Sequence, residues 1–388
     1  MKNKESLLKV ALLSTCFVSA SLNAITGNIP EIAKAFPSLP LTTVELLMTI
    51  PSLFQMFGVL GGKGIAKGIG YKNTMLLGLL LCGVGGVLPI FWHPFALLMI
   101  TRCMFGFGAG LMLSTILVLI VYFFEGQTRS TMIGLNGGIS GLGSALATFS
   151  AGQLLRFGWN ISFAVYFLAF LVLALFFFGV PNVRSVSARY ASADEGKKQE
   201  RPPFIKLLGL GLLMFVSVLL ATMYVIKAST LITESGFGTA KEGSLAITWL
   251  SLGSFTAGLT YGKIRGKIGE ISLSIFFLIC AAGFLCGMFA KSLVPVWIGA
   301  FLLGYGYLGF MPFIQEQASR NYAAYGETAT NLVLIFQSVG AFATPYLSSF
   351  FGLFTSELKI QFLITAICYG LMAVPAALVY RHKKGATQ

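Results

Sequence analysis

Long apolar stretches separated by short polar segments run through the whole chain. Each apolar stretch is about 20 residues long, which is enough for a helix to cross a hydrocarbon core of about 30 Å. An even number of such stretches places both termini on the same side of the membrane. The twelve predicted spans lie near residues 7–29, 44–62, 74–92, 95–123, 130–155, 160–180, 205–232, 244–262, 271–290, 294–318, 328–352 and 360–380.

The composition is that of a membrane protein with many spans. Of the 388 residues, 56% are hydrophobic and 10% are charged, whereas soluble proteins average roughly 25% charged residues. The first apolar stretch lacks a small-residue cleavage pattern and is followed at once by further stretches. We therefore expect a retained helix rather than a removable signal.

The net charge of +14 reflects orientation in the membrane. Most of the 27 Lys and Arg residues fall on the side that carries the termini, and basic residues favour cytoplasmic segments. We therefore expect a multi-pass protein of the plasma membrane, in contact with lipid and with both termini in the cytoplasm. The charge gives no reason to expect a nucleic-acid partner, and nothing in the sequence requires more than a monomer.

A polar segment divides the chain into two parts of six predicted spans each. Residues 182–203 carry many charges and almost no large apolar side chains, which predicts a flexible cytoplasmic linker. This linker joins an N-terminal bundle over residues 1–181 to a C-terminal bundle over residues 204–388.

Loop chemistry repeats between the two predicted bundles. The stretch Gly64–Gly70 after the second span resembles Lys263–Gly269 after the eighth. Gly106 in the fourth span corresponds in the same way to Gly304 in the tenth. Two similarly oriented bundles form the architecture in which a solute site lies at their interface, near the middle of the membrane.

Several motifs resemble those of the major facilitator superfamily, and the resemblance covers nearly the whole chain. The loop after the second span resembles the family signature G-x-L-A-D-R-x-G-R-K, but Lys67 replaces the usual aspartate, so the charge relay of that loop is not carried over. Arg102 and the glycines that follow it match the fourth-span motif. The glycine-rich stretch 134–143 resembles the antiporter motif, with Ser144 in place of its proline. Finally, Gly158–Asn160 resembles the G-W-R entry of the sixth span.

The resemblance implies an all-α membrane protein with the fold of that superfamily, in which 12 transmembrane helices form two pseudo-symmetric six-helix bundles. It also implies that the first, fourth, seventh and tenth spans line a central cavity, flanked by the second, fifth, eighth and eleventh. Hydrogen bonding between helices is the alternative role for the uncharged polar residues of these spans. The residues that we expect to bind substrate are Asn23, Gln55, Arg102, Asn136, Tyr224, Lys227, Tyr305 and Gln337.

Two cations lie within apolar spans, and each has two interpretations. Arg102 either faces the cavity and takes part in proton coupling, or it bonds carbonyls at a helix end. Either way it needs a partner, because a guanidinium in hydrocarbon costs roughly 2.5–3.5 kcal/mol. Lys227 lies near the outer boundary and either extends its amine to the interface or points inward, where it would favour an anionic group of the substrate.

Glu316 in the tenth span is the second candidate for proton coupling. It shares a helical stripe with Tyr305, Gly309 and Pro312, and Gly and Pro interruptions mark where transporter helices bend around a cavity. The alternative is a solvated acid at the cytoplasmic end, paired with Arg320 at the i, i+4 spacing.

Several classes of function find no support in the sequence. It contains no H-E-x-x-H, G-x-S-x-G or P-loop pattern, so neither an enzyme nor a nucleotide-driven pump is expected. The 2 histidines lie outside the spans and the 6 cysteines form no C-x-x-C pair, so no metal or other cofactor is expected. A gradient of protons or of solute would then drive transport.

Two transport functions and one other function remain. An interior rich in Phe and Met favours proton-coupled export of amphipathic compounds. Arg102 and Lys227 favour instead the uptake or exchange of a small organic anion, as does the lack of an acid in the hydrocarbon part of the first span. The third function is a membrane sensor that keeps the fold without transport. Ligand binding without flux in liposomes would identify it.

Overall fold

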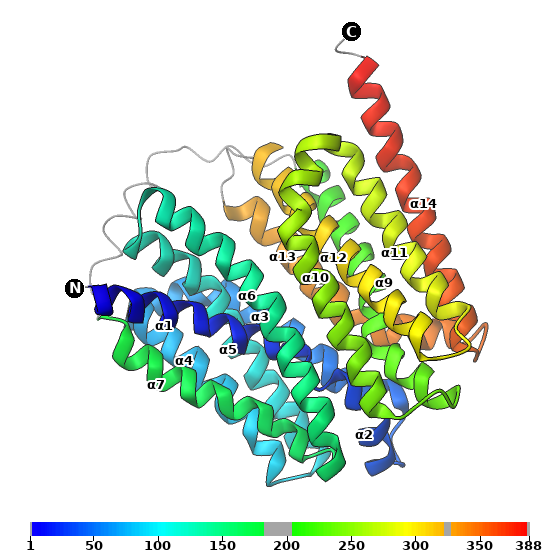
Figure 1. The fold of residues 1–388 in the computed structure, drawn as a ribbon, viewed down its shortest axis with the longest axis horizontal. Coiled ribbons are helices and arrows are strands. Elements are labelled where there is room, and N and C mark those ends of the chain that lie inside the picture. Colours follow the sequence, from blue (N-terminus) through cyan, green and yellow to red (C-terminus); the bar gives the residue numbers. More distant parts are fainter. Residues whose placement is uncertain (1, 182–203, 322–326, 386–388) are drawn as a thin grey trace.

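The computed structural model describes residues 2–181, 204–321 and 327–385, and all regular structure within these ranges is helical. The predicted linker, residues 182–203, lies outside the described residues. We call the segment from α1 to α7 the N-half and the segment from α9 to α14 the C-half. In Figure 1 most of the N-half occupies the left of the molecule and the C-half the right, while α2 lies below the helices of the C-half.

The N-half contains seven α-helices and five short 3₁₀ segments. Its elements are α1 (Lys2–Ala20), η1 (Ser21–Asn23), η2 (Thr26–Asn28), α2 (Ile29–Ala35), α3 (Leu41–Ile69), α4 (Tyr71–Val87), η3 (Leu88–Ile90), α5 (Phe95–Phe123), α6 (Gly126–Leu154), η4 (Leu155–Phe157), η5 (Ile161–Phe167) and α7 (Leu168–Gly179). The elements of the C-half are α9 (Phe204–Glu234), α10 (Ala240–Ile268), η6 (Gly269–Ile271), α11 (Ser272–Met288), α12 (Leu293–Asn321), α13 (Glu327–Gly352) and α14 (Leu358–Gly385).

Every predicted span falls on a helical segment. In the described parts of the chain, 9 segments are long and apolar enough to cross a membrane, and one of them, Ala240–Met288, contains both α10 and α11. The total of twelve crossings stays a prediction.

The sequence repeat reappears in the lengths and ends of the helices. Helices α3 and α10 each span 29 residues, and so do α5 and α12. Both α3 and α10 end at a glycine with positive φ, which is 87° at Gly70 and 60° at Gly269. A residue with a Cβ is strained in this conformation, so the glycines of the repeated loop stop the two helices at the same point.

The glycines of the fourth and tenth spans hold helices in close contact. A Cβ added to Gly106 of α5 would collide with the backbone of Pro51 in α3, and one added to Gly304 of α12 would collide with the backbone of Leu250 in α10. Such close approach of backbones is the usual role of small residues between membrane helices. Each half is therefore tightly packed at corresponding places.

Buried apolar residues form two clusters, one for each half. The first contains residues from Ala11 to Val180, together with Ile226 of α9, and the second runs from Met214 to Ala373. Between the halves, α3 packs along α13 and α6 packs along α10. Each half thus has its own core, and Ile226 extends the core of the N-half across the interface.

The two halves are tied together at the end of the molecule where α2 lies (Figure 1). There η2 packs against α9 and α10. The Ser229 hydroxyl donates to the carbonyl of Gly27 at 2.5 Å, and the Ser244 hydroxyl donates to Asn28 Oδ1 at 3.2 Å. A Cβ on Gly27 would collide with the Ser244 backbone. We call this region, made by η2, α2, the start of α3, the end of α9 and the start of α10, the closed end.

Candidate functional site

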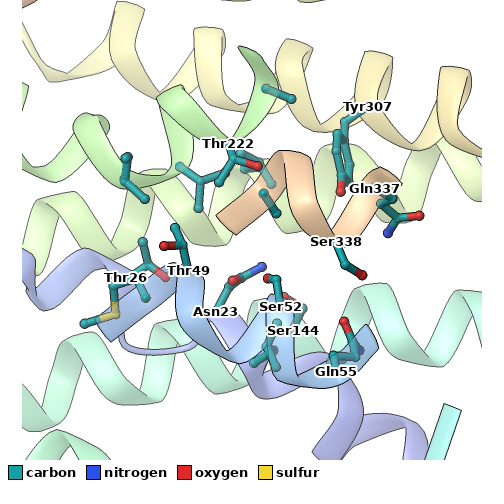
Figure 2. Close-up of a pocket in the computed structure, with 18 of the residues that line it drawn as sticks. Asn23, Thr26, Thr49, Ser52, Gln55, Ser144, Thr222, Tyr307, Gln337 and Ser338 are labelled. Carbon is teal, nitrogen blue, oxygen red and sulfur yellow. The ribbon is translucent and has the colours of Figure 1, made fainter. Parts of the chain in front are cut away.

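A cavity of about 330 Å³ lies between the two halves. Figure 2 shows side chains from both halves directed toward a common space, such as Ser52 and Gln55 from α3 and Tyr307 from α12. The residues that line it are Ser19, Ala20, Leu22, Asn23, Thr26, Met48, Thr49, Ser52, Gln55, Ser144, Ala221, Thr222, Val225, Ile226, Leu250, Leu303, Tyr307, Met311, Gln337, Ser338 and Ala341.

A smaller cavity of about 20 Å³ continues from the first along α3 and α13, and shares Gln55, Gln337 and Ser338 with it. At the closed end, the hydroxyls of Thr42 in α3 and Ser349 in α13 are 2.7 Å apart. Asn331, which lines the smaller cavity, precedes Ser349 by 18 residues in α13, which is roughly 27 Å along the helix axis. The smaller cavity therefore leads away from the closed end.

The cavity wall is uncharged. About half of the lining side chains carry a hydroxyl or an amide, the rest are apolar, and none is Asp, Glu, Lys, Arg or His. Thr49, Ser52 and Gln55 follow one another at a spacing of three on one face of α3, which turns a polar stripe toward the cavity. Within the described residues no group of three His, Cys, Asp or Glu side chains is placed to hold a metal ion. The absence of a cofactor stays a prediction.

The structure brings three of the predicted substrate-binding residues together in the cavity wall. They are Asn23 of η1, Gln55 of α3 and Gln337 of α13. Gln337 also accepts a hydrogen bond from the Gln315 amide at 3.4 Å. The other predicted residues lie elsewhere.

Arg102 is buried inside the N-half, with 1% of its surface exposed. Its guanidinium donates to the carbonyl of Gly85 at 3.2 Å and to the Tyr166 hydroxyl at 3.3 Å. The guanidinium carbon also lies 4.9 Å from the ring centre of Phe163 and 5.3 Å from that of Phe105. Because Gly85 is in the last turn of α4, the geometry is that of the helix-end alternative. Helix α5 packs behind α3 and contributes no residue to the cavity wall described above.

Lys227 of α9 forms an ion pair with Glu45 of α3 across the interface between the halves. The Nζ–Oε1 distance is 2.6 Å, and the side chains of Lys227 and Glu45 are 6% and 1% exposed. Glu234, at the end of α9, adds a negative charge close to Glu45. Extension of the amine of Lys227 to the membrane surface, one of the two interpretations from sequence, is therefore wrong. The amine points inward to the Glu45 carboxylate, a pairing that no sequence pattern predicts.

Tyr224, Tyr305 and Asn136 make hydrogen bonds between helices. The Tyr224 hydroxyl donates to the carbonyl of Val296 at 2.6 Å in the interior of the C-half. The hydroxyls of Tyr305 and Thr260 are 2.7 Å apart, and Cys16 donates to the Asn136 amide oxygen at 2.8 Å.

Glu316 pairs within the C-half. Its Oε2 accepts from the Tyr261 hydroxyl at 3.1 Å and from Arg265 Nε at 3.4 Å, so it links α12 to α10. The carboxylate is one-third exposed. The side chain of Arg320, the partner named from sequence, lies outside the described residues.

Sequence reasoning missed most of the hydroxyl groups in the cavity wall and the acid of the ion pair. Thr26, Thr49, Ser52 and Thr222 look like ordinary residues of an apolar helix when they are read one at a time. The signal that would have found three members of the wall is the polar stripe of α3 described above. Glu45 lies near the predicted membrane boundary, where an acid is unremarkable in a sequence.

Comparison with known proteins agrees with this architecture. A family model described as Major Facilitator Superfamily matches residues 11–345. Among solved structures, the in meso crystal structure of the POT family transporter PepTSo is similar, with a TM-score of 0.74, 16% sequence identity and coverage of 99% of each chain. At this identity the likeness to the solved structure concerns the fold alone, whereas the family match extends over both halves.

Proposed function

The chain belongs to the major facilitator superfamily, and from this premise we propose that it carries a small organic solute through the cavity by alternating access. It is a multi-pass membrane transporter and not an enzyme. The observation that carries the proposal is the cavity itself. Residues from both halves line it, and the halves are tied together at the closed end. A relative rotation of the halves would then expose the same wall to the other side.

We assign the closed end to the outer side of the membrane and the termini to the cytoplasm. This assignment rests on the excess of Lys and Arg in the segments on the side of the termini. The structure then corresponds to a state whose cavity leads toward the cytoplasm. Opening to the outside requires separation of η2 from α9 and α10 and rupture of the Glu45–Lys227 pair.

We place proton coupling at this ion pair. Protonation of Glu45 would leave Lys227 as a buried charge without a counter-charge, and breaking a buried pair in this way costs roughly 3–5 kcal/mol. That cost falls only on the state in which the halves are closed at this end. Glu316 is less suited to the role, because Tyr261 and Arg265 belong to the same half and move with it. Arg102 is likewise held within one half.

Of the two transport functions, proton-coupled export of amphipathic compounds agrees better with the cavity wall. Met48, Met311 and Leu303 supply adaptable apolar surface beside the hydroxyl and amide groups. The alternative, uptake of an organic anion, requires Arg102 or Lys227 to bind the anion. Arg102 is instead bonded to the Gly85 carbonyl, and Lys227 is paired with Glu45.

Flux measurements in liposomes containing the full-length protein test the proposal. Radiolabelled benzoate, tetraphenylphosphonium and an uncharged phenyl glucoside serve as probes, each with and without an imposed proton gradient. Gradient-driven flux of at least one probe, lost in empty liposomes, is expected. Saturable binding without flux under any gradient would instead identify a membrane sensor and overturn the transport function.

A further inference from the structure

The cavity wall contains two buried hydroxyl groups without a protein partner. Thr26 of η2 and Thr49 of α3 are 1% and 2% exposed, and in the described part of the chain neither side-chain oxygen has a hydrogen-bond partner. Figure 2 shows them close together at one end of the cavity, with Asn23 and Ser52 farther along it. A buried hydroxyl left unpaired costs roughly 1–3 kcal/mol. These two groups are therefore available to a ligand that offers donors or acceptors.

The buried ionisable side chains Lys227, Glu45 and Arg102 already have partners within the protein. Lys227 and Glu45 neutralise each other at 2.6 Å, and the guanidinium of Arg102 is engaged by Gly85 and by aromatic rings. An ion that entered the cavity would lose its hydration and meet no opposite charge on the wall, which is strongly unfavourable. The wall thus discriminates against net charge of either sign.

The uncharged groups of the wall suit a ligand with several hydroxyls or amides. Ser52, Ser338 and Tyr307 are hydroxyls that donate and accept, and Gln55 and Gln337 each offer both functions through one amide. Apolar residues of α10 and α12, such as Leu250 and Leu303, also line the cavity and can cover an aliphatic or aromatic part. At about 330 Å³ the cavity is at the small end of the roughly 300–1,000 Å³ seen for ligand sites. A solute of the size of a nucleoside or a small glycoside fits this volume.

Resting on the transport function proposed above, we propose that the solute is uncharged and carries several hydroxyl or amide groups beside an apolar part. Some of these polar groups bind the hydroxyls of Thr26 and Thr49. A single charge on the solute excludes it, whichever its sign. This class is narrower than the amphipathic compounds inferred from composition and rules out the organic anion.

Three glycosides that differ in one group test the class with the full-length protein in lipid nanodiscs. The three compounds differ only at C6 of the sugar. Phenyl β-glucoside has an uncharged hydroxyl there, phenyl β-glucuronide has a carboxylate, and phenyl 6-amino-6-deoxy-β-glucoside has an ammonium group. Binding is measured by calorimetry, and flux is measured separately in liposomes. We expect the uncharged glycoside to bind at least 10-fold more tightly than either charged one, because a buried charge without a partner costs more than the roughly 1.4 kcal/mol that this factor represents.

Matched variants locate the binding groups. Thr26→Val and Thr49→Val keep the side-chain shape, and each should weaken binding of the uncharged glycoside about 5- to 10-fold. Thr115→Val is the control, because this buried hydroxyl bonds to the carbonyl of Leu111 within α5 and lies away from the cavity wall. Gln337→Glu should shift preference toward the amino glycoside, since it adds the counter-charge that the wall lacks.

The outcomes separate this inference from the transport function. Equal or tighter binding of a charged glycoside, or no binding of the uncharged one, overturns the solute class. Flux of the charged glycoside would leave the transport function standing. Conversely, tight binding of the uncharged glycoside without flux supports the solute class and overturns transport.

Discussion

Arg102 and Lys227 are both cations in apolar helices, but they occupy opposite positions relative to the interface between the halves. All the partners described for Arg102 belong to the N-half, and they are a carbonyl, a hydroxyl and aromatic rings. Lys227 faces a carboxylate of the other half. An arginine whose partners move with it stabilises one bundle. A lysine whose partner is on the opposite bundle stabilises one conformation.

Loss of Arg102 should have the largest effect on stability. Arg102→Met removes two hydrogen bonds and the contacts with the rings of Phe163, Phe105 and Tyr166, which together should cost about 3 kcal/mol or more. Thermal unfolding of the purified protein in detergent measures this loss. Arg102→Lys keeps the charge but cannot bond both partners in the same way, and should be intermediate. A fully stable Arg102→Met protein that has lost transport would contradict the structural role.

Loss of one member of the Glu45–Lys227 pair should shift the balance between closed and open conformations more than it lowers the stability of the protein. Lys227→Met leaves Glu45 buried without its counter-charge, so the closed end should open more often. The labelling rate of Thr42→Cys by a membrane-impermeant maleimide should rise on the order of 10- to 100-fold.

The double variant with Glu45→Gln and Lys227→Met is the matched control for that experiment. It removes both charges, so labelling should return toward the wild-type rate. Equal labelling in the single and double variants would contradict the ion pair as a tie between the halves.

Added methyl groups should distinguish contacts within a half from contacts between halves. Gly106→Ala forces α5 away from Pro51 in α3 and should lower stability by roughly 1–3 kcal/mol. Gly27→Ala meets Ser244 across the interface and should mainly raise labelling at position 42. Gly61→Ala is the control, since a Cβ there has open space. A reversal of the first two effects would contradict the division into two moving bodies.

Replacement of Glu316 should have the smallest effect. Glu316→Gln weakens a partly exposed pair with Arg265, and such pairs contribute roughly 0–1 kcal/mol. The dependence of transport on the pH gradient should persist in this variant and disappear in Glu45→Gln. If Glu316→Gln abolished that dependence while Glu45→Gln retained it, coupling would belong to Glu316.

The sequence predicted the helices and their repetition well because these depend on local composition. Gly106 and Gly304 indicated close packing in both halves, and both are in backbone contact with a neighbouring helix. Asn23, Gln55 and Gln337 were also placed among the lining residues. Amides in apolar helices are rare enough to attract attention without a structure.

The rest of the site depends on how helices far apart in the chain meet. Hydroxyls such as Ser52 and Thr222 do not stand out, because Ser and Thr in a helix can usually bond to the helix backbone. The Glu45–Lys227 pair joins α3 to α9 across the interface, at the end of the molecule where η2 and α2 pack against α9. No spacing within α3 or α9 encodes that contact.

The central claim is that the halves must separate at the closed end during each transport cycle. The most direct test is a cross-link between Thr42→Cys and Ser349→Cys, whose native hydroxyls are 2.7 Å apart on α3 and α13. The control is Thr260→Cys with Tyr305→Cys inside the C-half, where the native hydroxyls are also 2.7 Å apart. Because cysteine is shorter than tyrosine, the cross-linker must be long enough to span the added distance between these two thiols. We predict that this cross-linker stops liposome flux in the first variant, reversibly on reduction, and leaves flux in the second unchanged. Undiminished flux with the halves cross-linked at the closed end would contradict the account.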